Sequence, residues 1–341
     1  MSRHALTLTV AGIAAVVLLA VAAVLPVPYV ILGPGPTLNT LGTTRAGKPM
    51  IEISGHRVYP ASGHLNMVTV SYEGGPGSDL SVYDALQAWL QPQEAVVPQR
   101  ELFAPGQSQK QAQQAELAQM SGSQQVATAA ALYQLGIPYK VEVAGTLKGL
   151  PAYGVLRPGD VVTAVDGTPV TSIPRLTSLI TAHRAGTPVR LTISRHGTTR
   201  QVRIRTVEDH GKPAVGTYVQ PAGFPFSVKI NVGDIGGPSA GMMFALGIID
   251  KLTGDNLTGG KFIAGTGTIG PDGTVGPIGG IQEKMAAARD KGATVFLAPA
   301  ANCPDTVGAV PAGLRVVKVS TLAGAVHDLQ ALKAGKPVPS C

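Results

Sequence analysis

The stretch Asp234-Ile-Gly-Gly-Pro-Ser-Ala-Gly241 organises the second half of this chain. It follows an alternating apolar run, residues 226–232, and precedes a continuous apolar run, residues 242–252. This order predicts a strand, a turn with little side-chain cover, and then a helix. Ser239 would stand at the N-terminus of that helix, where free backbone N–H groups can stabilise a developing negative charge. The alternative is that Ser239 is only the N-cap of the helix, a frequent role of serine.

A second glycine-rich turn, Gly279-Gly-Ile-Gln-Glu-Lys284, leads into another predicted helix, residues 281–291. A lysine on a helix is ordinarily a solvated charge. If Lys284 is buried instead, desolvation lowers its pKa, because burial penalises the charged form. The neutral amine can then take a proton from a serine hydroxyl and return it to a leaving amine. Ser239 and Lys284 are therefore a candidate Ser–Lys pair, although their spacing alone does not place them in contact.

Length and composition limit the classes of protein that this chain can belong to. The 341 residues are enough for roughly two domains. The net charge is +7, but lysine and arginine are spread along the chain without clusters or interleaved aromatics, which argues against nucleic-acid binding. Cys303 and Cys341 can pair if the body of the chain is exported. No Cys/His cluster has the spacing of metal ligands, so we expect neither a metal nor a cofactor.

An apolar segment near the N-terminus predicts a membrane anchor. Residues 5–25 carry no charge and are mostly Ala, Val and Leu, and about 20 such residues can span a membrane as a helix. Arg3 and His4 precede it, which favours a cytoplasmic N-terminus and an extracytoplasmic body. The alternative is a cleaved signal peptide, whose apolar core is usually about 7–15 residues long. We expect an uncleaved anchor over residues 1–27 and a Pro- and Gly-rich linker over residues 28–49.

The next segments predict short strands and then a long helix. Residues 50–80 look like short strands, and residues 108–135 are rich in Gln, Ala, Leu and Met without proline, which predicts one long helix or two. The apolar positions of this helical segment have roughly helical spacing, and we interpret them as core packing. They are Leu117, Met120, Val126, Ala130 and Leu132.

Residues 137–206 predict a compact unit of short strands with one helix, residues 174–184. Its centre, Gly154-Val-Leu-Arg-Pro-Gly-Asp-Val-Val-Thr-Ala-Val-Asp-Gly-Thr-Pro-Val170, resembles the strand-turn-strand core of PDZ domains. The resemblance implies a groove that takes an extended peptide by strand addition. The loop that holds a peptide carboxylate is expected near residues 135–137, and no single peptide contact is assigned. The alternative is a β unit that only packs against its neighbour.

Three segments closely resemble the proteolytic domain of the Lon proteases, within about residues 213–330. They are Gly236-Gly-Pro-Ser-Ala-Gly-Met-Met-Phe-Ala-Leu246, Gly265-Thr-Gly-Thr-Ile269 and Val275-Gly-Pro-Ile-Gly-Gly-Ile-Gln-Glu-Lys284. The resemblance implies that Ser239 is the nucleophile, that Lys284 is the general base, and that Thr266 orients the lysine amine. It also implies an oxyanion hole made by backbone N–H groups around Ser239, in the region of Gly237, Pro238 and Ala240.

The chain also departs from that family. The ATPase region is absent, since the nearest phosphate-loop-like stretch, residues 254–261, lacks a hydroxyl residue after its lysine. The resemblance therefore implies an ATP-independent, membrane-anchored endopeptidase that cleaves peptides or proteins presented by its PDZ unit. Residues 63–69 and 120–130 resemble the early strands and first helix of the protease domain. We predict an α+β fold in which residues 50–135 and 208–341 form one discontinuous protease domain around a PDZ unit, residues 136–207.

The sequence is also compatible with two other functions. One is a non-catalytic scaffold in which the PDZ unit binds peptides and the Lon-like part is structural. The other is a serine hydrolase with a histidine base, for example His210 or His327, although neither lies in a recognisable triad motif. Lon-like domains commonly assemble into homo-oligomers, but nothing in this sequence marks an interface, and the substrate is not indicated.

Overall fold

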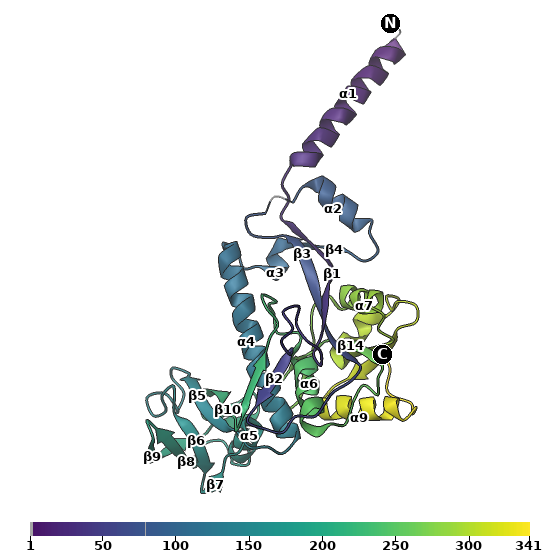
Figure 1. The fold of residues 1–341 in the computed structure, drawn as a ribbon. Helices are drawn as coiled ribbons and strands as arrows, with labels where there is room; N and C mark the ends of the chain where they lie inside the picture. Colours follow the sequence, from purple (N-terminus) through teal and green to yellow (C-terminus); the bar gives the residue numbers. More distant parts are fainter. Residues whose placement is uncertain (1–2, 79) are drawn as a thin grey trace.

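The computed structural model describes residues 3–78 and 80–341, and its fold is mixed α+β, as predicted (Figure 1). Helix α1 (Arg3–Val24) projects away from the rest of the chain, and its apolar stretch, residues 4–23, is not buried. By length and composition α1 is the one helix among the described residues that is able to cross a membrane. The apolar helix predicted at the N-terminus is therefore present.

One six-stranded sheet is built from both halves of the chain. In spatial order its strands are β18 (Arg315–Val319), β17 (Val295–Pro299), β14 (Phe262–Gly265), β3 (His64–Gly74), β1 (Tyr29–Asn39) and β4 (Ala95–Pro98). β1 pairs antiparallel with β3 and with β4, whereas β14 pairs in parallel with both β3 and β17. Strands from the N-terminal and C-terminal parts of the chain thus share one hydrogen-bonded layer.

Strand β1 lies in the segment predicted to be a linker, residues 28–49, and that prediction is wrong for residues 29–39. The prolines do not break the strand, because the β1–β3 register shifts between Pro34 and Thr37, at an irregularity that tolerates residues without an N–H donor. Gly35 allows the close approach of the two strands, since a Cβ there would lie 2.7 Å from the Thr69 carbonyl carbon. Val30 is completely buried and ties the strand to the core.

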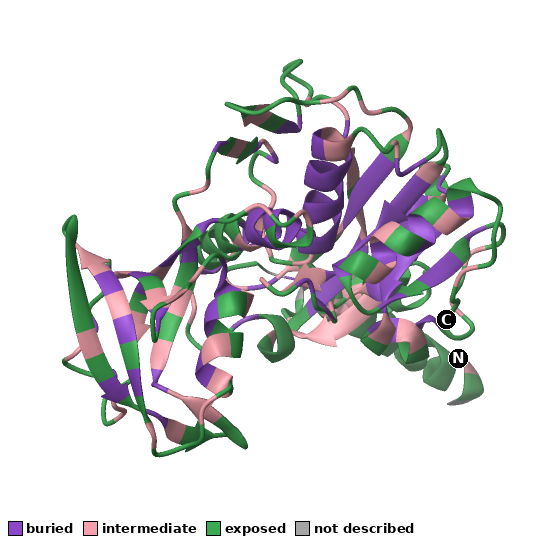
Figure 2. Ribbon diagram, turned by 90° about the horizontal axis from the view of Figure 1, so that it is seen from below, coloured by how far each residue is buried: buried purple, intermediate pink, exposed green. Residues whose placement is uncertain are grey.

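Helices cover both faces of the sheet. Successive side chains of a strand point to opposite faces, so neighbouring residues of β3 pack against different helices. Met67 of β3 belongs to the core cluster that contains α6 (Gly241–Thr253), and α6 is itself buried along nearly its whole length (Figure 2). The next residue, Val68, belongs to a separate cluster that contains α7 (Ile281–Asp290). The long helix predicted before the PDZ-like unit is the single helix α4 (Gln109–Gln134), which packs against α6.

A second sheet forms what we call the β module. Its strands lie in the order β12-β5-β6-β8-β9, with β7 beside β6, and the module includes one helix. The bounds are β5 (Lys140–Thr146), β6 (Val161–Val165), β7 (Thr168–Pro169), α5 (Ile173–Thr181), β8 (Pro188–Arg195), β9 (Thr198–Arg205) and β12 (Thr217–Ala222). Strand β12 follows the segment in which the sequence predicted the PDZ-like unit, and it forms one edge of the sheet.

The remaining elements are short. They are β2 (Ile51–Ser54) with its antiparallel partner β13 (Ser227–Ile230), α2 (Val82–Trp89), α3 (Gln99–Leu102), the hairpin of β10 (Val207–Asp209) and β11 (Lys212–Ala214), the pair β15 (Thr268–Ile269) and β16 (Val275–Gly276), the 3-10 helix η1 (Ala300–Asn302), α8 (Cys303–Thr306) and α9 (Leu322–Lys333).

A buried ion pair stabilises the β module. Arg195 donates hydrogen bonds from Nε and Nη2 to the two carboxylate oxygens of Asp160, at 2.6 and 2.7 Å, and a further bond to the Val155 carbonyl. Burial by itself raises the pKa of the Asp160 carboxyl, but the hydrogen bonds and charge of Arg195 outweigh it and hold the pKa below its usual value. The turn before β6 is thereby fixed to the end of β8.

The two cysteines, whose pairing the sequence left open, form the disulfide Cys303–Cys341. The bond holds the C-terminal residues against α8 and β18, where the Lys318 N–H also donates to the Pro339 carbonyl at 3.2 Å.

Removing this disulfide should reduce stability. The bond closes a loop of 38 residues, and a loop of that length restricts the unfolded chain enough to contribute about 3–4 kcal/mol in the chain-entropy description. We expect Cys341→Ser to lower the free energy of unfolding by about that amount, measured by urea unfolding of the non-reduced protein. Ser340→Ala is the matched control, and a Cys341→Ser protein that unfolds at the wild-type urea concentration would contradict the prediction.

Candidate active site

Ser239 lies in the connection between β13 and α6 and is half-buried. The N-cap of α6 is Ala240, and this helix end has no side-chain capping hydrogen bond. Ser239 is therefore not acting as a capping residue, and the simpler alternative considered from the sequence is wrong. Its side chain instead lines a cleft beside the six-stranded sheet.

The Ser239 carbonyl is fixed from the side of β14. It accepts a hydrogen bond from the Gly267 N–H at 2.8 Å and another from the Thr266 hydroxyl at 3.0 Å. Thr266 is fully buried. The structure thus brings Thr266 and Ser239 together, through a contact between the threonine hydroxyl and the serine backbone that the sequence did not specify.

Helix α4 holds the other side of the same turn. The Gly237 N–H donates to the Glu116 carbonyl at 3.0 Å, and the Ser123 hydroxyl donates to the Pro238 carbonyl at 3.1 Å. At Gly236 a Cβ would lie only 2.5 Å from the Glu116 Cβ. The turn therefore lies between α4 and the end of β14. Glu116 and Ser123 were not predicted as site residues, since their sequence context shows only a polar helix.

The close approach at Gly236 leads to a prediction. If Ser239 is the protease nucleophile that the resemblance implies, Gly236→Ala should move the turn away from α4 and lower kcat/KM for peptide hydrolysis by about 10²-fold, because small displacements of a catalytic group have effects of that size. The measurement is cleavage of a quenched fluorescent peptide library, with circular dichroism to verify folding. Gly122→Ala is the matched control, since nothing lies within 4 Å of a Cβ at that position in α4. Unchanged cleavage by Gly236→Ala would show that the turn tolerates the shift.

Lys284 lies on α7 and its residue surface is only 2% exposed. Burial lowers the pKa of its amine to about 8, and the nearby charge of Glu283 offsets part of that effect. Gly280 is the N-cap of α7. Its carbonyl accepts the Lys284 N–H, and a Cβ on Gly280 would lie 2.7 Å from Val70 Cγ1. Val70 in turn lines the Ser239 cleft, so the first turn of α7 adjoins the cleft wall.

The structure does not join the two predicted catalytic side chains directly. Among the described residues, no hydrogen bond connects the Lys284 amine with the Ser239 hydroxyl, and Lys284 is not one of the residues that line the cleft. Hydrogen bonds between catalytic groups are often long before substrate binds.

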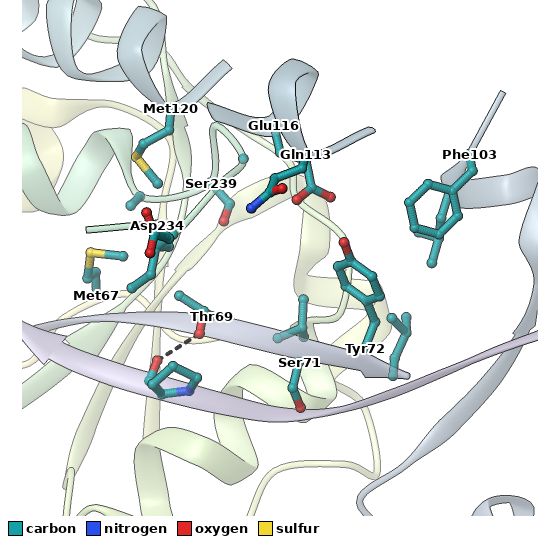
Figure 3. Close-up of a pocket in the computed structure, with 18 of the residues that line it drawn as sticks. Met67, Thr69, Ser71, Tyr72, Phe103, Gln113, Glu116, Met120, Asp234 and Ser239 are labelled. Carbon is teal, nitrogen blue, oxygen red and sulfur yellow. Dashed lines mark hydrogen bonds between the residues drawn. The ribbon is translucent and has the colours of Figure 1, made fainter. Parts of the chain in front are cut away.

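The cleft has a volume of about 580 Å³ and is bordered by β1, β3, α4 and the Ser239 turn. Met67 and Met120 lie near Ser239, and Glu116 lies on its other side (Figure 3). The sequence predicts that Met120 packs in the core. Met120 is buried, and it also borders the cleft. Burial raises the pKa of the Glu116 carboxyl above its usual value, which reflects the weak hydration of this wall.

Strand β3 has an unpaired stretch beside the cleft. Its parallel pairing with β14 ends at Met67, opposite Gly265. Beyond this point, in the described part of the chain, the only strand paired with β3 is β1, on its other side. Thr69, Val70, Ser71 and Tyr72 of the unpaired stretch line the cleft. An extended peptide can therefore form backbone hydrogen bonds to this edge.

Of the three residues predicted around the oxyanion hole, Ala240 retains a free donor. Pro238 has no N–H group, and the Gly237 N–H is bonded to Glu116. Within the described residues, the N–H groups of Ala240 and Ser239 have no hydrogen-bond acceptor, and they lie at the N-terminus of α6. The local dipole there favours negative charge.

The histidines considered from the sequence lie elsewhere. His210 is exposed in the turn of the β10–β11 hairpin, where its Nδ1 lies 2.7 Å from a carboxylate oxygen of Asp209. His327 lies on α9. In the part of the chain that the structure describes, no histidine lines the Ser239 cleft.

Comparisons with known families agree with this architecture. The family profile of the PDZ domain matches residues 124–206, and that of the Lon protease (S16) C-terminal proteolytic domain matches residues 230–329. No match was found among curated proteins.

Several solved structures resemble a part of this chain. The PDZ domain of an SdrC-like protein from Listeria monocytogenes is 25% identical; the match covers 23% of this chain and 85% of that one, with a TM-score of 0.22. The corresponding Listeria innocua domain is 23% identical over 24% and 92% of the two chains, with a TM-score of 0.23. A Geobacillus thermodenitrificans solution structure is 28% identical over 22% and 86%, with a TM-score of 0.21.

Behind one apolar N-terminal helix, the chain thus combines a segment that matches the PDZ domain with a segment that matches the Lon protease (S16) C-terminal proteolytic domain.

Proposed function

We propose that this protein is an ATP-independent serine endopeptidase in which Ser239 is the nucleophile and Lys284 the general base. The observation that carries the proposal is the burial of Lys284, because it lowers the amine pKa to about 8, within reach of the neutral form near physiological pH. The cleft beside Ser239 and the two free N–H groups at the start of α6 add to this support.

The proposed reaction follows from these groups. A peptide lies along the unpaired edge of β3, with its scissile carbonyl next to Ser239. The neutral Lys284 amine accepts the hydroxyl proton as Ser239 Oγ bonds to the carbonyl carbon. The resulting oxyanion accepts hydrogen bonds from the N–H groups of Ser239 and Ala240. The Lys284 ammonium then returns the proton to the leaving amine, and water hydrolyses the acyl-enzyme by the same steps. Substrate binding must bring the amine within reach of the hydroxyl.

We further propose that the protease domain is discontinuous and that the PDZ unit, residues 136–207, is inserted into it. Strands β1 and β3 from before the insertion share a sheet with β14, β17 and β18 from after it, and α4 holds the Ser239 turn. The domain then includes β1 in addition to residues 50–135 and 208–341, except that β12 joins the sheet of the β module.

The PDZ unit offers a place for substrate presentation. A pocket of about 230 Å³ lies between α5 and the segment that contains β12, the edge strand of the β module. A peptide added to this edge would lie on a strand whose chain continues through β13 to the Ser239 turn. We propose that this arrangement delivers bound peptides to the cleft.

We propose that α1 anchors the protein in a membrane with the remainder on the extracytoplasmic side. The apolar length of α1 supports the anchor, and the Cys303–Cys341 disulfide supports an oxidising compartment. Cleavage of α1 as a signal sequence is the alternative, and the mass of the membrane-associated protein distinguishes the two.

Labelling by a fluorophosphonate probe tests the proposed chemistry. The probe should modify the wild-type protein in membranes, and mass spectrometry of the digested protein should place the modification on Ser239. Lys284→Met should abolish labelling, because the hydroxyl then lacks a base. A wild-type protein that is folded and binds peptides but is never labelled would support the non-catalytic scaffold instead. Labelling that requires His210 or His327 would indicate a different base.

A further inference from the structure

Helix α2 begins immediately beside the end of α1. The Val82 N–H donates to the Leu25 carbonyl at 3.3 Å, and the Val27 N–H donates to the Leu80 carbonyl at 2.8 Å. Pro26 and Ser81 form an isolated antiparallel bridge between these two contacts. The first turn of α2 is therefore fixed at the level where α1 ends (Figure 1). If α1 crosses a bilayer, α2 starts at the surface of that bilayer.

The inner face of α2 packs against β1 and its neighbours. Ala88 is buried in a small cluster with Ile31 and Leu80, and Ala85 packs against the same cluster. A capping box stabilises the start of the helix, in which the Ser81 and Asp84 side chains each bond to the backbone of the other residue. The helix is thus firmly attached to β1, with one side of it turned away from the core.

The outer face of α2 and its C-cap is apolar and exposed. Tyr83 is 57% exposed, Leu86 54%, Trp89 73% and Leu90 76%. Their spacing of three to four residues places them on one side of a helix. Trp89 is the only tryptophan in the sequence. No described residue covers this face, which is costly for four large apolar side chains in water.

A bilayer interface fits this face better than a protein partner does. Tryptophan and tyrosine are enriched at the boundary between headgroups and acyl chains, and short amphipathic helices lie in the same plane. The attachment of α2 to the end of α1 provides the required depth without any further partner. We propose that the face formed by Tyr83, Leu86, Trp89 and Leu90 is inserted in the interface of the bilayer that α1 crosses. The inference rests on the proposed membrane anchor.

Because Trp89 is unique, its fluorescence tests the proposal in the full chain. The protein is reconstituted into phosphatidylcholine–phosphatidylglycerol vesicles and purified by flotation. We expect Trp89 emission to be blue-shifted, to be quenched by brominated acyl chains, and to be protected from aqueous iodide. The control is Trp89→Phe combined with Tyr218→Trp, since Tyr218 is 59% exposed on β12 of the β module. That tryptophan should be quenched by iodide and not by brominated lipid.

A pair of substitutions tests whether the outer face of α2, and not another part of the helix, contacts the lipid. Leu86→Asp should reduce brominated-lipid quenching of Trp89 by about half or more, because a charge withdraws the helix from the interface. Gln87→Asp is the matched control on an exposed neighbouring position and should leave the quenching unchanged.

Each other outcome overturns the proposal in a distinct way. Iodide quenching of Trp89 in floated vesicles would show that α2 lies in water although the anchor holds. Protection from both quenchers would indicate that a second copy of the chain covers the face. Failure of the protein to float with the vesicles would show that α1 does not anchor it in a membrane. That result would not bear on the proposed Ser–Lys chemistry.

Discussion

Replacing Ser239 with alanine should lower the rate of peptide hydrolysis by about 10⁴-fold or more, because loss of a nucleophile removes the covalent pathway and leaves only binding and oxyanion stabilisation. The Ser239 carbonyl would keep its hydrogen bonds to Gly267 and Thr266, since these involve the backbone. Folding should therefore be intact, and the effect should appear in kcat with little change in KM. The measurement is steady-state cleavage of a quenched fluorescent peptide library by the membrane-bound protein.

The matched control for this prediction is Ser320→Ala. Ser320 is exposed just after β18 and is not among the cleft residues. It should retain wild-type cleavage. If Ser239→Ala keeps more than a small fraction of the wild-type rate, Ser239 is not the nucleophile and the cleft has another role.

Replacing Lys284 with methionine should produce a loss of the same order, about 10⁴-fold, and the wild-type pH profile should report the same group. With an amine pKa of about 8, roughly a tenth of the protein carries neutral Lys284 at pH 7 and most of it does at pH 9. Because the base must be neutral to accept a proton, kcat/KM should rise about tenfold between pH 7 and pH 9 and then level off. The two single losses should not add in the double variant, since the residues act as a unit.

Lys291→Met provides the control on the same helix. Lys291 is the C-cap of α7 and is exposed, so its removal should leave the pH profile unchanged. A Lys284→Met protein that folds and still cleaves peptides with a rise near pH 8 would assign that titration, and the base, to another residue. Methionine is chosen because it retains most of the buried volume of the lysine side chain.

Much of the fold was predictable, because the motifs involved are local. The apolar N-terminal helix, the long helix α4 and the turn–helix segments at Ser239 and Lys284 depend on short-range patterns of apolar residues and glycines. The part that could not be predicted consists of pairings between distant segments. Strand β1 has the composition of a linker, and only its contact with β3 explains why Pro34 and Gly35 are compatible with a strand.

The candidate site shows the same division. The residue types at Ser239 and Lys284 predicted a chemical role, and the resemblance to the Lon proteases implied one for Thr266, whereas nothing in the sequence pointed to the partners that fix the turn. The Ser123 hydroxyl donates to the Pro238 carbonyl, 115 positions away in the sequence, and no local sequence pattern predicts such a bond. The burial of Lys284 could likewise not be predicted from the sequence, because a lysine beside apolar residues on a helix can equally well be exposed to solvent.

Strand β1 has a geometric consequence for which bonds can be cut. It begins at Tyr29, five positions after the end of α1, and carries Leu32 and Pro36 into the wall of the cleft. At about 3.3 Å per residue, the six steps from Pro26 to Leu32 span only about 20 Å. In an anchored enzyme this short, extended connection limits the distance between the cleft and the membrane surface. Polypeptides held close to the lipid surface come within its range, whereas freely diffusing proteins meet the cleft only by approaching that surface.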